Sequence, residues 1–141
     1  MNQTAREIID KLELQPHPEG GWYKETYRHD PEDGARGDQT AIFFLLEKGQ
    51  SSHWHRIDAV EMWHWYAGSP LVLKSHDGKQ EQVVTLGPDV LAGQTPQFVI
   101  PEQHWQAASA EDGWALVGCT VAPAFEFDRF ELAEPGWSPE S

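Results

Sequence analysis

The sequence predicts an all-β fold, a sandwich or barrel of the jelly-roll kind, preceded by one short N-terminal helix. Short segments with the residue types and alternation of β-strands recur along the chain. Turn-forming residues, including 12 Gly and 10 Pro, separate these segments. Seven Trp, six Phe and three Tyr suit sheet faces and apolar cavities better than helices. Because these strands do not alternate with helices, the pattern argues against parallel βαβ units.

The N-terminal residues have the pattern of one amphipathic helix. Thr4 stands three residues before a Glu, which is the spacing of a capping box, and Ile9 and Leu12 belong to one apolar stripe. A residue that precedes proline is disfavoured in the α conformation, so the helix must end before Pro16. We therefore expect a helix over about residues 4–15.

The period of the hydrophobic pattern changes to two after Gly21. A polar loop over residues 30–38 separates the first two strands, and Asp77-Gly78 is a hairpin turn signal between two later ones. We expect strands over residues 22–28, 40–46, 52–57, 60–66, 71–76, 80–86, 97–100, 104–108 and 114–121.

The C-terminal part of the chain is less clearly patterned. Residues 125–130 carry three Phe at a spacing that fits either a last strand or a short helix. Beyond Glu134 the tail is expected to be irregular. The length is that of one domain, so we expect a single domain over 1–141, with a barrel over about 20–132 and a tail over 133–141.

Composition and charge exclude several classes of protein. The 23 acidic and 10 basic residues give a formal charge of -13, which repels phosphate backbones, so no nucleic acid is expected as a partner. The longest apolar run, residues 41–46, is far shorter than the roughly 20 residues of a membrane helix. No membrane or secretory role is therefore expected. A single Cys119 rules out an internal disulfide framework and favours a reducing, cytoplasmic location.

Residues 51–68 combine histidines, aromatic rings and a glutamate. Because side chains alternate along a strand, His53 and His55 are expected to share one face, and Glu61 could add a carboxylate. Two imidazoles and a carboxylate suit Zn, Mn, Fe or Ni. These three residues are the metal-ligand candidates. The alternative is that the histidines are ordinary hydrogen-bonded strand residues.

This stretch resembles the first motif of the cupin superfamily, in which His-x-His is followed by a Glu and, after six more residues, by a Gly. His53, His55, Glu61 and Gly68 match these positions. Five residues separate His55 from Glu61, where the family has three or four.

The second cupin motif, Pro-x-Gly-x-x-His, aligns with Pro101 but is altered. Gln103 replaces its Gly, and Gln106 replaces its metal-binding His, which weakens the metal hypothesis. Other segments resemble one branch of cupins that has no established common reaction, and this resemblance covers about residues 5–132. The matching segments, the first of which reads Gln-Pro-His-Pro-Glu-Gly-Gly, are 15–21, 54–56, 61–68, 86–89 and 118–123.

The resemblance implies a double-stranded β-helix barrel that dimerises and holds a small-molecule pocket. It places Glu61 inside the barrel, where a buried carboxylate needs a partner such as His55. His64 and Tyr66 share a face and could act as base and acid, as His and Tyr do in sugar-nucleotide epimerases of similar fold. Strict alternation puts this pair opposite Glu61. Either one face looks into the cavity, or a bulge re-aims the side chains.

The candidates for ligand binding come from several segments, and each has an alternative. Trp54, Trp63 and Trp65 could line a cavity, although such rings are more often core residues. Glu19 lies in a Gly-rich stretch that could be a binding loop or only a tight connection from helix to strand. The remaining ligand-binding candidates are Tyr23, His104 and Gln106, of which the last two share a strand face.

Three functional hypotheses follow. The first is a cupin that binds a small polar metabolite, such as a sugar or sugar nucleotide, and transfers protons as an isomerase or epimerase through His55, Glu61, His64 and Tyr66. The second is a non-catalytic binding or sensing protein, with a purely structural dimer as its extreme form. The third is a divalent-metal-dependent cupin enzyme, and the sequence identifies no cofactor beyond this possible metal. The expected partners are a small-molecule ligand and a second copy of the chain.

Overall fold

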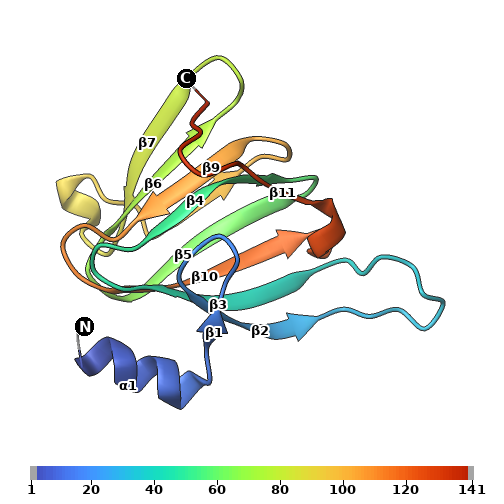
Figure 1. Ribbon diagram of the computed structural model, residues 1–141, viewed down its shortest axis with the longest axis horizontal. Helices are drawn as coiled ribbons and strands as arrows, with labels where there is room; N and C mark the ends of the chain where they lie inside the picture. Colours follow the sequence, from blue (N-terminus) through green and yellow to red (C-terminus); the bar gives the residue numbers. More distant parts are fainter. Residues whose placement is uncertain (1–2, 140–141) are drawn as a thin grey trace.

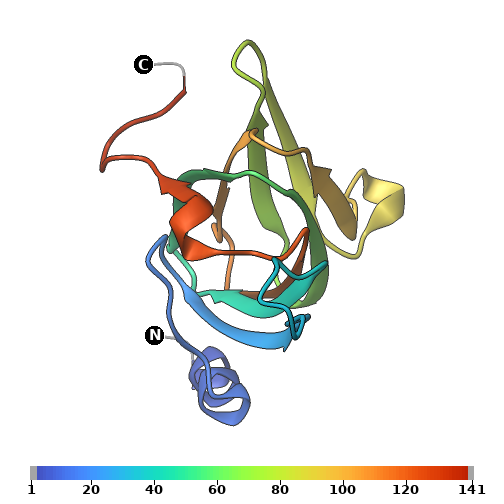
Figure 2. The same ribbon diagram turned by 90° about the vertical axis from the view of Figure 1, so that its right-hand side faces the viewer.

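Two antiparallel β-sheets face each other and form a barrel, and one α-helix lies outside it (Figure 1). The structure is a computed structural model and describes residues 3–139. Figure 2 views the barrel from one end, and the C-terminal 3₁₀ segment lies at this end. The predicted all-β jelly-roll class is confirmed.

The larger sheet has six strands and carries the N-terminal part of the chain. In spatial order it consists of β1 (Gln15–Pro16), β2 (Trp22–Arg28), β3 (Thr40–Leu46), β10 (Ala115–Ala122), β5 (Val60–Gly68) and β8 (Gln97–Ile100).

The smaller sheet has five strands and closes the other side of the barrel. In spatial order it consists of β11 (Phe130–Leu132), β4 (Ser51–Ile57), β9 (Trp105–Ser109), β6 (Leu71–His76) and β7 (Glu81–Leu86). Two 3₁₀ segments, η1 (Val90–Ala92) and η2 (Phe127–Arg129), complete the described elements.

Helix α1 (Gln3–Leu12) packs on the outer side of the larger sheet and is shorter than expected. Glu13 has a left-handed backbone with φ 60°, and the amide of Leu14 donates to the carbonyl of Ile9, so the helix ends there. Ile9 and Leu14 are buried against Leu45 of β3. The apolar stripe of the sequence is therefore the face that attaches the helix to the sheet.

Each predicted strand is present, with small shifts at the ends. The C-terminal Phe-rich segment forms both predicted alternatives in succession, since η2 is followed directly by β11. The two-residue strand β1, which pairs with β2, was not predicted.

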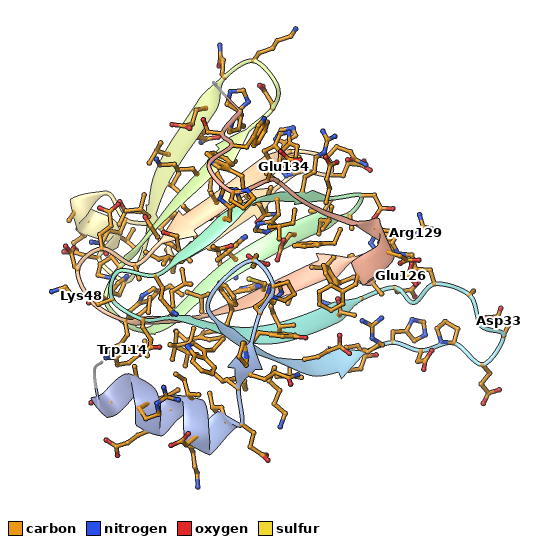
Figure 3. The ribbon with its side chains drawn as sticks, in the orientation of Figure 1. Asp33, Lys48, Trp114, Glu126, Arg129 and Glu134 are labelled. Carbon is orange, nitrogen blue, oxygen red and sulfur yellow. The ribbon has the colours of Figure 1, made fainter. Side chains whose placement is uncertain are left out.

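The apolar core lies between the two sheets. Its largest fully buried members include Phe44, Trp63 and Leu73. The polar 30–38 stretch is a loop that projects from the barrel, with Asp33 near its tip (Figure 3). Among the described helices, none is long and apolar enough to span a membrane. The structure contains one chain, so dimerisation stays a prediction.

Candidate functional site

A cavity of about 230 Å³ lies at one end of the barrel, between the larger sheet and the segment that contains η2. Most of its polar lining consists of ionisable groups and short hydrogen-bonding side chains, and its apolar lining is rich in phenyl rings. The lining residues are Gln15, His17, Glu19, Tyr23, Glu25, Thr40, Ile42, His55, Ile57, Glu61, Cys119, Val121, Phe125, Phe127 and Phe130.

Cross-strand register explains how the larger sheet contributes to this cavity. Thr40, Val121 and Glu61 form one row across β3, β10 and β5, and all three are buried. Because alternate side chains of a strand face the same way, Glu61 and Trp63 point inward while His64 points outward. The inward carboxylate that the cupin resemblance implied is therefore present.

A β-bulge in β4 changes which histidine reaches the cavity. Ser52 pairs with Ala108 and His55 with Gln106, so β4 has one residue more than β9 over this stretch. Ser52 and His55 are buried and both contact Glu19, whereas the ring of His53 bonds at Nε2 to the carbonyl of Glu134, 2.8 Å away. The prediction that His53 and His55 share a face is wrong, because the bulge breaks the alternation.

Glu19 lies on the loop between β1 and β2 and reaches into the cavity. Its carboxylate accepts a hydrogen bond from the Ser52 hydroxyl and lies 3.4 Å from His55 Nε2 and 3.3 Å from His17 Nδ1. Gly20 has φ 110°, and a Cβ there would collide with the Ser51 carbonyl oxygen. The Gly-rich stretch therefore makes the tight connection that its glycines require, and it also presents two ionisable groups to the cavity.

Glu61 accepts the last of two linked hydrogen bonds, and the donors of both bonds are uncharged side chains. The indole Nε1–H of Trp63 donates to Gln106 Oε1 at 2.7 Å, and Gln106 Nε2 donates to Glu61 Oε1 at 2.9 Å. Gln106 is fully buried. Since the indole can only donate, it orients the amide so that its NH₂ group faces the carboxyl of Glu61. The Cys119 thiol also contacts this carboxyl.

Burial shifts the pKa values of four groups around the cavity. It raises the pKa of Glu19 to about 8 and that of Glu61 to about 7, because a charged carboxylate loses its hydration there. Burial also lowers the pKa of His17 to about 3, with His55 as the second cause, and lowers the pKa of His55. Near neutral pH both imidazoles are therefore uncharged, while the two carboxyls are close to their titration points.

The tautomer of His55 follows from its hydrogen bond. Nδ1 lies 2.7 Å from the backbone carbonyl of His53, which can only accept, so the proton of the neutral ring is on Nδ1. Nε2 then presents a lone pair toward Glu19. A protonated Glu19 and the free nitrogen of His55 thus form an acid and an acceptor on one wall of the cavity.

The donor set does not fit the divalent metal that the cupin fold suggests. His53 lies away from His55 and Glu61, and the uncharged amide of Gln106 stands at the position of the second-motif His. Over the described part of the chain, no group of three or more His, Cys, Asp or Glu side chains is arranged to hold a metal ion. The predicted trio of metal ligands is not assembled.

Two predicted catalytic residues lie outside the cavity. His64 Nε2 is 3.1 Å from the Thr120 hydroxyl, and Nδ1 is 3.2 Å from the Gln97 amide. Tyr66 is half exposed and its ring covers Gly118 on the outer side of the larger sheet. The bulge that the sequence left open does occur in the pairing of β5 with β10, at this tyrosine. It does not turn either side chain into the cavity.

Of the other candidates, some line the cavity, some lie behind Glu61 and some lie elsewhere. Tyr23 and Glu19 line the cavity, whereas Gln106 and Trp63 lie behind Glu61. Trp54, Trp65 and His104 do not line it. Trp65 packs on the core and donates to the Ser69 carbonyl at 3.0 Å, so for this ring the core alternative holds.

Sequence reasoning missed several lining residues. Cys119 was not a candidate, and His17 was predicted only as part of the Gly-rich stretch that could be a binding loop. For Phe125, Phe127 and Phe130 the sequence predicted only a strand or a short helix, and no role in a cavity. They form a cluster with centroids 4.8 to 6.0 Å apart, and the His17 ring lies about as close to two of them.

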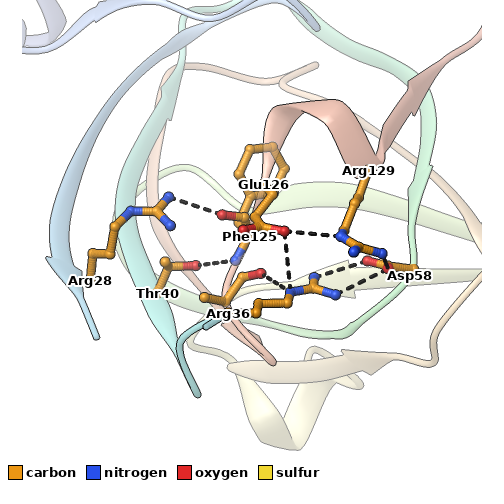
Figure 4. A network of polar contacts seen from close by, with 8 residues as sticks. Arg28, Arg36, Thr40, Asp58, Phe125, Glu126 and Arg129 are labelled. Carbon is orange, nitrogen blue, oxygen red and sulfur yellow. Dashed lines mark hydrogen bonds and ion pairs between the residues drawn. The ribbon is translucent and has the colours of Figure 1, made fainter. Parts of the chain in front are cut away.

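Arginine pairs fasten the phenyl-bearing segment to the barrel (Figure 4). Arg36 makes a bidentate pair with Asp58 at 2.9 and 3.0 Å and donates to the Ala124 carbonyl. Arg129 bonds both Asp58 and Glu126. The aromatic wall of the cavity is therefore held by a polar network at its rim.

Two facing antiparallel sheets around a polar cavity at one end define a jelly-roll barrel of the cupin type. An oxalate decarboxylase from Bacillus subtilis shares this fold, with a TM-score of 0.65 and 12% identity over 83% of this chain and 29% of the other. The chain belongs to the family described as Cupin superfamily (DUF985), whose sequence model matches residues 6–133.

Two solved structures from other organisms are much more similar. A protein from Shewanella oneidensis has a TM-score of 0.86 and 40% identity, over 92% of this chain and 84% of the other. A hypothetical protein from Leishmania major has a TM-score of 0.83 and 32% identity, over 92% and 86%. No curated protein matches the chain in sequence.

Proposed function

We propose that the chain binds a small polar metabolite in the barrel cavity and transfers protons on it, as an isomerase or epimerase does. The observation that supports this is the pair of buried carboxyls, Glu19 and Glu61, which line one cavity with His55 beside them. Their raised pKa values, about 8 and about 7, suit groups that give and take protons near neutral pH.

Proton-transfer isomerisation removes a proton from one ligand atom and returns one to another. Glu61, with the lower pKa of the two carboxyls, is the base in this proposal, and Gln106 keeps its carboxyl aimed at the cavity. Glu19 is the acid, and the free Nε2 of His55 can take its proton and relay it. His64 and Tyr66 have no part in this mechanism.

The size and charge of the cavity decide between the expected ligand classes. A volume of about 230 Å³ holds roughly eight water molecules at about 30 Å³ each. That space suits a single small sugar or a metabolite of similar or smaller size, and not an entire sugar nucleotide. None of the described lining residues is Lys or Arg, so a diphosphate has no cationic partner there.

Hydrogen–deuterium exchange on the ligand tests proton transfer directly. Small metabolites are incubated with the protein in D₂O, and ¹H NMR follows the loss of carbon-bound proton signals. We expect exchange with wild type and with Glu32→Gln, an exposed carboxyl that serves as the control, and none with Glu61→Gln. Equal exchange rates in wild type and Glu61→Gln would overturn the proposal.

A non-catalytic binding protein is the second candidate, and the hydrogen bonds of Gln106 favour it. An amide has replaced the motif imidazole and ties Glu61 to Trp63, which is a well-satisfied structural arrangement. A ligand that binds saturably in the cavity and shows no exchange, either with wild type or with Glu61→Gln, would support this function instead.

A further inference from the structure

The charges around the cavity are unbalanced. Glu25, at its rim, is paired with Arg28 at 2.8 Å. Glu61 is 7% exposed, and its described hydrogen-bond partners, Gln106 and Cys119, are both uncharged. Glu19 is held by the Ser52 hydroxyl and by histidines whose pKa values burial lowers. Two buried carboxyls thus face one cavity without a fixed cation.

Another part of the cavity lining is aromatic. Phe125, Phe127 and Phe130 line the cavity, and Tyr23 joins them through the His17 ring, whose centroid is 4.5 Å from that of Tyr23. The face of an aromatic ring carries negative potential and attracts cations, most strongly where water is excluded. The aromatic wall and the carboxyls therefore favour the same sign of charge, although they come from different segments of the chain.

We propose that the ligand of this cavity is a small organic cation, an ammonium group on a body of about eight non-hydrogen atoms, whose nitrogen contacts Glu61 and Glu19 and whose apolar part packs on the phenyl rings. This rests on the proposed function in one respect, that the cavity is the ligand site, and it adds the chemical class of the ligand. Anions, among them carboxylates and phosphates, are disfavoured because no described lining residue is a Lys or Arg.

Because the two carboxyls are buried and hold protons near neutral pH, a cation that binds between them displaces a proton. Without a ligand, the carboxyl of Glu61 keeps a proton up to pH about 7 and that of Glu19 up to about 8. A cation stabilises the ionised form, so its binding expels a proton. The other ionisable groups that line the cavity are Tyr23, Glu25, which is paired with Arg28, the two histidines, whose pKa values burial lowers, and Cys119, whose pKa burial raises.

The pH dependence has a definite sign. If the cation binds only when Glu61 is ionised, its apparent affinity falls about tenfold for each pH unit below 7. We therefore expect binding about tenfold tighter at pH 8 than at pH 6. Displacement of the Glu19 proton as well would make the difference larger.

Three probes of nearly equal shape separate charge from size. Benzylammonium, benzyl alcohol and benzoate are titrated into the full chain by isothermal calorimetry at pH 6, 7 and 8. Two buffers with different ionisation enthalpies give the number of protons released. We expect benzylammonium to bind at least tenfold more tightly than benzyl alcohol, with release of about one proton at pH 6, and benzoate to bind worst.

Variants tie the signal to the named residues. Glu61→Gln is expected to weaken benzylammonium at least tenfold and to abolish the pH dependence, whereas Glu32→Gln, an exposed control, leaves both unchanged. Phe127→Leu, on a half-exposed ring, is expected to weaken benzylammonium several-fold and benzyl alcohol less. Thermal unfolding verifies that each variant is folded.

Several outcomes overturn the inference. Benzyl alcohol or benzoate that binds as tightly as benzylammonium contradicts the charge selection, as does benzylammonium binding that Glu61→Gln leaves unchanged, or no binding of benzylammonium at all. The proposed function fails separately, when no metabolite of any charge shows exchange that depends on Glu61. A neutral ligand with such exchange would therefore keep the proposed function and reject the cation.

Discussion

Gln106 donates a 2.9 Å hydrogen bond to Glu61 from the opposite sheet of the barrel, at the position where the second cupin motif has a histidine. The same amide accepts from Trp63 at 2.7 Å, so one side chain satisfies two buried polar groups. This link joins β9 to β5 behind the cavity. It fixes the orientation of the carboxyl to which both proposals assign a role.

Loss of this link should destabilise the fold. In Gln106→Leu the indole N–H and the carboxyl lose their partner in a buried place, so we expect a loss of about 1–3 kcal/mol in the free energy of unfolding at pH 7. Urea unfolding measures it, with Gln82→Leu, which changes an exposed side chain of β7, as the control. A change no larger than that of the control would show that water or another group replaces the amide.

The carboxyls should make stability fall with rising pH. Folded-state pKa values of about 7 and about 8, raised above the ordinary value, mean that the folded state binds more protons than the unfolded state, so their contribution is lost as pH rises through these values. Below about pH 6.5, protonation of the unfolded histidines opposes this trend. We expect stability to decline between pH 6.5 and 8.5.

Glu61→Gln isolates the part of that decline due to one carboxyl. The variant should have a shallower slope in this range and exceed wild type in the free energy of unfolding at pH 8.5, by about 1–3 kcal/mol, because no buried charge forms. Urea unfolding at several pH values gives both slopes, and Glu32→Gln should follow wild type. Parallel slopes for wild type and Glu61→Gln would contradict the raised pKa of this group.

The strands could be predicted because they depend on alternation within short segments, whereas the inward direction of Glu61 was implied by the cupin resemblance and not by alternation. The face of β4 on which His53 lies could not be predicted. The bulge that determines it arises from the pairing of β4 with β9 and leaves no pattern in the sequence of β4 itself. The phenyl wall was missed for a related reason. Phe125, Phe127 and Phe130 reach the cavity through the fold of a 3₁₀ segment, which their spacing alone does not specify.

Motif residues gave a mixed result that has a physical cause. Glu19 lies in a Gly-rich stretch for which two roles were predicted, a tight chain connection or a binding loop. The same tight loop has both roles, because it connects the chain and places Glu19 in the cavity. His64 and Tyr66 were chosen for their chemistry. The alternation of side chains along the strand had already placed them on the face opposite to Glu61, and the structure has them on that outer face.

The thiol of Cys119 should react slowly in the folded protein. It is 2% exposed, and burial together with Glu61 raises its pKa, so little reactive thiolate forms at pH 8. We expect modification by iodoacetamide to be at least about a hundredfold slower than in urea-unfolded chain. The chain has one cysteine, so mass spectrometry reports on this site alone. Rates within a few-fold of each other would contradict the raised pKa of the thiol in the folded protein.

Asp58 should control how firmly the aromatic wall is closed. Its carboxylate receives Arg36 from the β2–β3 loop and Arg129 from η2, so it is the point where these two segments are joined (Figure 4). In Asp58→Asn we expect only about 0.5–1 kcal/mol of lost stability, since the pairs are partly exposed.

The local effect of that substitution should be larger than the global one. The amides of Phe125 and Arg129, which bond Thr40 and Glu126, should exchange with deuterium several-fold faster in Asp58→Asn, because the segment opens without unfolding of the barrel. Glu13→Gln, which removes an exposed pair with Lys24, serves as the control. If the two amides exchange at the wild-type rate in Asp58→Asn, the phenyl rings are held by their own packing, and the arginine network at the rim contributes nothing to the wall.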